Sequence, residues 1–89
     1  MRFEWDSEKA AENVRKHRVS FDEAATAFFD PLSMTVPDPD HSVGERRFFP
    51  LGASSGGRLI VVAHTERGST LRIISARPAS ASERKRYET

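Results

Sequence analysis

The chain has 89 residues, with 14 basic and 13 acidic side chains and no cysteine. A chain of this length forms one domain with a limited core, so a shallow surface groove is easier to build than a deep active-site cavity. The lack of cysteine excludes a disulfide framework and a thiolate metal site. The N-terminus has no apolar signal-peptide core, and no apolar run approaches the ~20 residues that span a bilayer, so we expect a cytoplasmic protein.

Charge is distributed unevenly along the sequence. Residues 1–45 contain five basic and ten acidic side chains, a net charge of −5, whereas residues 46–89 contain nine basic and three acidic ones, a net charge of +6. A small domain polarised in this way can present a basic face to phosphates. Alternatively, the two halves intermingle in space and the polarity disappears.

The N-terminal third is predicted to be helical after a short edge strand or extended entry over 3–5. Asp6 is a suitable N-cap for a helix over 7–17, because its carboxylate can accept from the free amides of the first turn. A Ser-x-x-Glu capping box at Ser20 opens a second helix over 21–29, which an Asp-Pro dipeptide ends.

The remaining sequence is typical of strands joined by turns, followed by one short helix. Strands are predicted over 34–36, 46–51, 58–65 and 70–77, and a second capping box at residue 80 opens the terminal helix. Segregated helices and strands predict an α+β fold, in which helices cover one face of an antiparallel sheet and the other face is partly open.

The stretch 64–77 carries the residues with the most specific chemistry. The planar fork of arginine holds two phosphate oxygens and stays charged, while histidine and glutamate can move protons. Such groups suit RNA cleavage without metal, in which the ribose 2′-hydroxyl attacks the adjacent phosphate. The candidate catalytic residues are His64, Glu66, Arg67, Arg72 and Arg77.

Strand alternation divides these candidates between the two faces of the predicted hairpin. Pairing across an Arg67-Gly68 turn places Arg72 on one face and Arg77 on the face of His64 and Glu66. A β-bulge would change this division. Which of His64 and Glu66 acts as the base stays open, as does the alternative that the arginines are solvated strand residues with cross-strand ion pairs.

A metal site is not expected. The loop that contains Asp38, Asp40 and His41 offers ligands of the kind that Mg²⁺ accepts, but the spacing matches no metal motif. Aspartates are also ordinary in proline-rich turns. We therefore expect neither a metal nor another cofactor.

Four residues outside the hairpin are candidates for RNA binding, through phosphate contacts or base stacking. They are Arg46, Arg47, Arg84 and Tyr87. The alternative for the last two is that they belong to a solvated helix end.

Nine short motifs follow one another along almost the whole chain: Phe3-Glu4-Trp5-Asp6 with Lys9, Asn13-x-x-Lys16-His17, Val19-Ser20-Phe21-x-Glu23-Ala24, Phe29-Asp30-Pro31-Leu32, Asp38-Pro39-Asp40-His41, Glu45-Arg46-Arg47-Phe48, His64-Thr65-Glu66-Arg67-Gly68, Arg72-Ile73-Ile74-Ser75-Ala76-Arg77 and Glu83-Arg84-x-x-Tyr87. Each is weak alone, but their order and spacing are specific. Together they resemble the BrnT toxins of bacterial type II toxin–antitoxin systems. One departure is Arg18, where the family usually has glycine at a left-handed helix end.

The resemblance implies a RelE-like ribonuclease fold and metal-independent RNA cleavage that arrests translation. It also implies neutralisation by a BrnA-type antitoxin, a small DNA-binding protein, within a hetero-oligomer that involves no membrane. The family's active positions match Glu66, Arg67, Arg72 and Arg77, with His64, Arg84 and Tyr87 nearby. The alternative functions are a non-catalytic nucleic-acid-binding module and a protein-interaction module.

Overall fold

The structure of the protein is a computed structural model that describes residues 2–37 and 48–88. Helices and strands in these residues segregate along the chain, so the predicted α+β class is confirmed. The elements are β1 (Arg2–Glu4), α1 (Ser7–His17), α2 (Phe21–Ala27), β2 (Met34–Pro37), β3 (Phe48–Ala53), β4 (Leu59–Arg67), β5 (Thr70–Pro78) and α3 (Ala81–Glu88).

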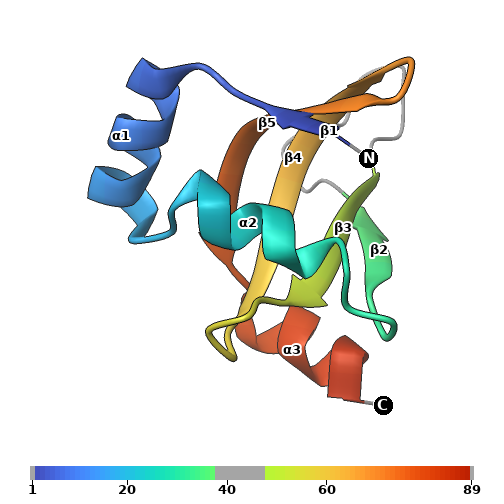
Figure 1. Ribbon diagram of the computed structural model, residues 1–89. Helices are drawn as coiled ribbons and strands as arrows, with labels where there is room; N and C mark the ends of the chain where they lie inside the picture. The colour runs from blue at the N-terminus through green and yellow to red at the C-terminus, as the bar shows by residue number, and fades with distance from the viewer. Residues whose placement is uncertain (1, 38–47, 89) are drawn as a thin grey trace.

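The described strands form one sheet in the order β1-β5-β4-β3-β2. Strands β2 to β5 make an antiparallel meander, while β1 returns to pair in parallel with β5. Figure 1 shows α2 lying across the sheet, α1 beside it, and α3 at the opposite end near the C-terminus.

The helix starts predicted from the sequence are confirmed. The carboxylate of Asp6 accepts from the amide of Glu8 at 2.9 Å, and the hydroxyl of Ser20 accepts from the amide of Glu23 at 3.0 Å. At α3 the capping box is reciprocal, because the amide of Ser80 donates to the Glu83 carboxylate and the Glu83 amide donates to the Ser80 hydroxyl. These caps satisfy amides that have no partner within the helix.

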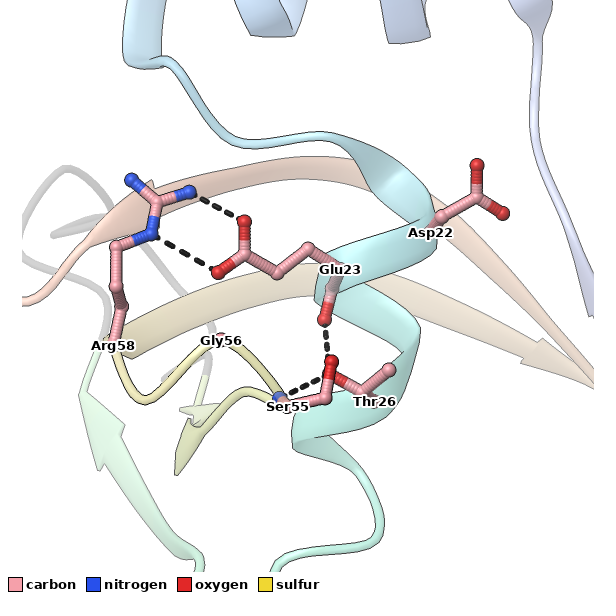
Figure 2. Close-up of a pocket in the computed structure, with 6 residues that line it drawn as sticks. All are labelled: Asp22, Glu23, Thr26, Ser55, Gly56 and Arg58. Atoms are coloured by element: carbon pink, nitrogen blue, oxygen red, sulfur yellow. Dashed lines mark hydrogen bonds and ion pairs between the residues drawn. The ribbon is translucent and has the colours of Figure 1, made fainter.

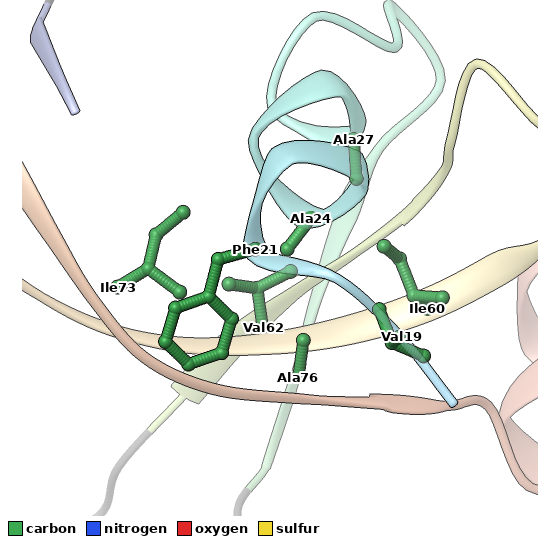
Figure 3. Close-up of a cluster of buried hydrophobic side chains, with 8 residues drawn as sticks. All are labelled: Val19, Phe21, Ala24, Ala27, Ile60, Val62, Ile73 and Ala76. Carbon is green, nitrogen blue, oxygen red and sulfur yellow. The ribbon is translucent and has the colours of Figure 1, made fainter. Parts of the chain in front are cut away.

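The main core lies between α2 and the sheet (Figure 3). It consists of Val19, Phe21, Ala24, Ala27, Ile60, Val62, Ile73 and Ala76. The buried side chain of Asn13 fastens α1 to this core, because its amide donates to the carbonyls of Val19 and Ala76 and its oxygen accepts from the Ala76 amide. Gly52 lets α2 approach closely, since a Cβ there would lie 2.7 Å from the Ala27 carbonyl oxygen.

A smaller cluster lies on the other face of the sheet. Val36, Leu51 and Val61 form it, and Tyr87 of α3 packs against it. The hydroxyl of Tyr87 donates to the Asp30 carboxylate at 2.6 Å. The C-terminal helix therefore covers one end of this face, which we call the open face. Within residues 2–37 and 48–88, no helix covers the other end, near the β4–β5 turn (Figure 1).

Arg18 ends α1 in the left-handed conformation, with φ of 59°. A side chain in this conformation costs about 1 kcal/mol relative to glycine. Arg18→Gly is therefore expected to raise the free energy of unfolding by about 1 kcal/mol. Urea unfolding should show this gain, whereas the control Arg15→Gly, in the interior of α1, should lose about the same amount. An unchanged or lower stability of Arg18→Gly would contradict the strain at this cap.

Candidate active site

A β-bulge decides which candidate residues share a face of the β4–β5 hairpin. Near the turn, His64 pairs with Ile73 and Thr65 with Arg72, but beyond the register shift Ala63 pairs with Ser75. Ile74 is thus the extra residue, and it reverses the alternation along the rest of β5. As a result Arg77 pairs with Val61 and lies on the open face with Arg72, not on the face of His64 as the unbroken alternation predicted.

Arginines gather at the uncovered end of the open face. Arg67 pairs with Thr70 across the hairpin, and Arg2 of β1 pairs with Thr70 from the other side. Paired residues point to the same face, and adjacent strands lie about 4.8 Å apart. The backbones of Arg2 and Arg67 are therefore about 10 Å from each other, with Thr70 between them. Arg72 lies on the same face two residues along β5. Sequence reasoning missed Arg2, because only the parallel pairing of β1 brings it here.

A carboxylate lies among these arginines. Glu4 pairs with Arg72 in the β1–β5 ladder, and its Oε2 accepts from Nη1 of Arg72 at 2.8 Å. The two side chains are 44% and 38% exposed, so a ligand can reach both. Glu4 was not a candidate from the sequence, where it appeared only as part of a motif.

Arg77 lies farther along the open face and holds α3. Its Nη1 and Nη2 donate to the two carboxylate oxygens of Glu83 at 2.7 and 2.9 Å. Glu83 is buried, and these hydrogen bonds from Arg77, together with one from the Ser80 amide, lower the pKa of Glu83 to about 2. Arg77 therefore binds Glu83 and anchors α3, and its catalytic role stays a prediction from the sequence.

His64 and Glu66 lie together on the face that α2 covers. Their Nε2 and Oε1 atoms are 3.8 Å apart, and the His64 ring meets the ring of Phe28 edge-on at 5.0 Å between centroids. The His64 side chain is largely buried, and its Nδ1 has no hydrogen-bond partner among the described residues. The sheet itself therefore separates this pair from Arg72.

The RNA-binding candidates of α3 differ in their surroundings. Arg84 is exposed. Tyr87 is half-buried, and its hydrogen bond to Asp30 raises the pKa of the phenol. The ring packs against the smaller cluster, so Tyr87 fastens α3 to the sheet.

Some predicted residues lie outside the described part of the chain. These are Arg46 and Arg47, proposed for RNA binding, and the loop residues Asp38, Asp40 and His41. Within residues 2–37 and 48–88, no group of three or more potential metal ligands is found. None of the helices in these ranges is long and apolar enough to cross a membrane.

A pocket lies between α2 and the β3–β4 loop, and several of the residues that line it bind one another (Figure 2). Its lining residues are Asp22, Glu23, Thr26, Ser55, Gly56 and Arg58. Arg58 binds Glu23 through two nitrogens and lowers the pKa of that carboxyl, while Thr26 accepts from the Ser55 amide at 2.9 Å. Because these polar groups hold the loop to the helix, we assign the network to stability.

Comparisons with known proteins identify the family. The family model described as "Ribonuclease toxin, BrnT, of type II toxin-antitoxin system" matches residues 5–83. The 1.1 Å crystal structure of the Brucella abortus ribonuclease toxin BrnT is similar, with 26% identity, a TM-score of 0.65, and coverage of 90% of this chain and 97% of that one. No curated protein gave a significant match. The chain therefore belongs to the BrnT family of ribonuclease toxins from type II toxin–antitoxin systems.

Proposed function

We propose that this protein is an endoribonuclease that cleaves RNA without a metal ion and thereby arrests translation. Family membership supports RNA as the substrate and an antitoxin as the partner. The observation that carries the proposal is the cluster of Arg2, Arg67 and Arg72 on the exposed end of one sheet face. Arginines placed in this way can hold a phosphodiester and stabilise the charge that develops on it.

In this proposal the scissile phosphate lies on the open face against Arg67 and Arg72. The 2′-hydroxyl attacks the phosphate in line with the 5′-oxygen, and the guanidinium groups stabilise the phosphorane, in which negative charge accumulates on the equatorial oxygens. Arg77 lies on the same face nearer to α3, where its guanidinium is paired with the Glu83 carboxylate. His64 and Glu66, the two candidates for proton transfer, lie on the opposite face of the sheet from Arg67 and Arg72.

The antitoxin is proposed to be a BrnA-type protein. It would neutralise the toxin most directly by covering the arginine cluster with an acidic segment. Complementary charge at this surface would speed association and exclude RNA from the same site.

The function is tested by incubating the purified protein with a labelled single-stranded RNA in excess EDTA or in Mg²⁺. Cleavage at equal rates in both conditions, with 2′,3′-cyclic phosphate ends, is the expected result. A second arm supplies mRNA-programmed ribosomes in place of free RNA. Cleavage that EDTA abolishes on free RNA would contradict metal independence, and intact RNA in both arms would contradict the ribonuclease activity itself.

A further inference from the structure

We propose that Glu4 is the proton acceptor of the cleavage reaction. This inference rests on the proposed ribonuclease function and adds a catalytic residue to it. Cleavage needs a base close to the cations that hold the phosphate, because the 2′-oxygen and the phosphate are attached to neighbouring atoms of one nucleotide. Among the described residues of the open face, Glu4 is the carboxylate that meets this requirement, since it contacts Arg72 at 2.8 Å.

The sheet register places Glu4 within the arginine cluster. Glu4 pairs with Arg72 and Arg72 pairs with Thr65, so these three residues point to one face from three adjacent strands. Arg2 lies two residues before Glu4 on β1 and therefore points to the same face. A phosphate bound between Arg67 and Arg72 would have the Glu4 carboxylate at its side.

The two acid–base candidates from the sequence are placed less favourably. His64 and Glu66 occupy the opposite face, where the His64 ring is packed against Phe28. A nucleotide whose phosphate is held by Arg72 would have to pass around the edge of the sheet to reach them. Glu4 lies on the same face as Arg72, so the same nucleotide can reach it directly.

The ion pair between Glu4 and Arg72 can be exchanged for substrate at low cost. Pairs with this degree of exposure contribute about 0–1 kcal/mol to stability. A phosphate that binds bidentately to Arg72 replaces the carboxylate as its partner. The released carboxylate stays in place on β1, beside the sugar of the bound nucleotide, and can accept a hydrogen bond from the 2′-hydroxyl.

The 2′-hydroxyl gives its proton to Glu4 while the 2′-oxygen forms a bond to phosphorus. The bond from phosphorus to the 5′-oxygen breaks with its electron pair on oxygen, which takes a proton from solvent water. The products are a 2′,3′-cyclic phosphate and a free 5′-hydroxyl, and Glu4 returns its proton to solvent.

Glu4→Gln tests this assignment, because it keeps the shape of the side chain and an oxygen that accepts from Arg72. The cleavage rate on single-stranded RNA is expected to fall by about 10²–10⁴-fold, the contribution typical of a general base. Affinity for a non-cleavable 2′-O-methyl RNA of the same sequence is expected to stay equal or to rise, because a negative charge beside the phosphate has been removed.

Matched variants separate the possible outcomes. Glu12→Gln removes an exposed carboxylate from α1 that pairs with Lys16, and it is expected to leave the cleavage rate unchanged. Glu66→Gln tests the competing carboxylate on the other face. Thermal unfolding of each variant confirms that the fold is intact.

A large loss of cleavage rate in Glu4→Gln, with equal or higher affinity for the 2′-O-methyl RNA, would support Glu4 as the base. If Glu4→Gln cleaves within tenfold of the wild type, the assignment is overturned while the ribonuclease function stands. A large loss in Glu66→Gln alone would move the base to the other face. If the wild type leaves both free and ribosome-bound RNA intact, the proposed function fails and the assignment of Glu4 fails with it.

Discussion

Replacing Arg72 by glutamine is expected to lower the rate of RNA cleavage by about 10²-fold, the loss that follows removal of one donor to a developing oxyanion. Arg72 lies between Glu4 and Thr65 on the open face, where the phosphate is proposed to bind. Glutamine keeps a hydrogen-bond donor but removes both the charge and the bidentate fork. Most of the loss should therefore appear in the rate of the chemical step, measured at saturating RNA.

The control for this variant is Arg15→Gln, which removes an equal charge from the exposed surface of α1. It should cleave at the wild-type rate, although weak long-range attraction of RNA falls slightly with net charge. Because the pair between Arg72 and Glu4 is half-exposed, unfolding of Arg72→Gln should change by less than about 1 kcal/mol. A loss of activity below tenfold would remove Arg72 from the catalytic site.

Local signals predicted the elements of the fold well. The N-caps at Asp6 and Ser20 and the capping box at Ser80 depend on side chains within three residues of each helix start, so sequence contains them directly. The α+β fold class followed from the order of helices and strands. The second helix was predicted to end at residue 29 but ends at Ala27, because an irregular turn precedes the Asp-Pro dipeptide.

The arrangement of the candidate site was less predictable because it depends on contacts between distant residues. The pair of adjacent isoleucines before Ser75 interrupts the period of two and is consistent with a bulge, but it does not show which residue is extra. The parallel pairing of β1 with β5 joins residues almost seventy positions apart, and this pairing alone brings Arg2 and Glu4 to Arg72. No local pattern reports such a pairing.

The ion pair between Arg77 and Glu83 was also not predicted from the sequence. Glu83 was predicted only as part of a capping box, yet the same carboxylate binds both the Ser80 amide and the Arg77 guanidinium. One side chain can serve a cap and an ion pair because a carboxylate offers four lone-pair directions. Through this double use, Glu83 ties the start of α3 to β5.

Replacing Glu83 by glutamine is expected to destabilise the protein by about 2–3 kcal/mol at pH 7, since the hydrogen bonds of Arg77 hold the pKa of Glu83 at about 2 against an ordinary value of 4.5. The lowered pKa means that the folded state binds the proton less tightly than the unfolded state. The stabilisation is therefore fully present above pH 4.5 and is lost as the pH falls from there towards 2. The difference between wild type and Glu83→Gln should shrink over this window.

Urea unfolding of both proteins at pH 7, 5, 4 and 3 measures this difference, in which the titration of all other carboxyl groups largely cancels. Glu88→Gln is the matched control, because it removes an exposed carboxylate from the same helix and should stay within about 0.5 kcal/mol of wild type at every pH. Arg77→Gln should show a similar loss at pH 7, since it leaves the buried Glu83 carboxylate without its cation. A difference between wild type and Glu83→Gln that stays constant from pH 7 to 3 would mean that the charge of Glu83 does not stabilise the attachment of α3.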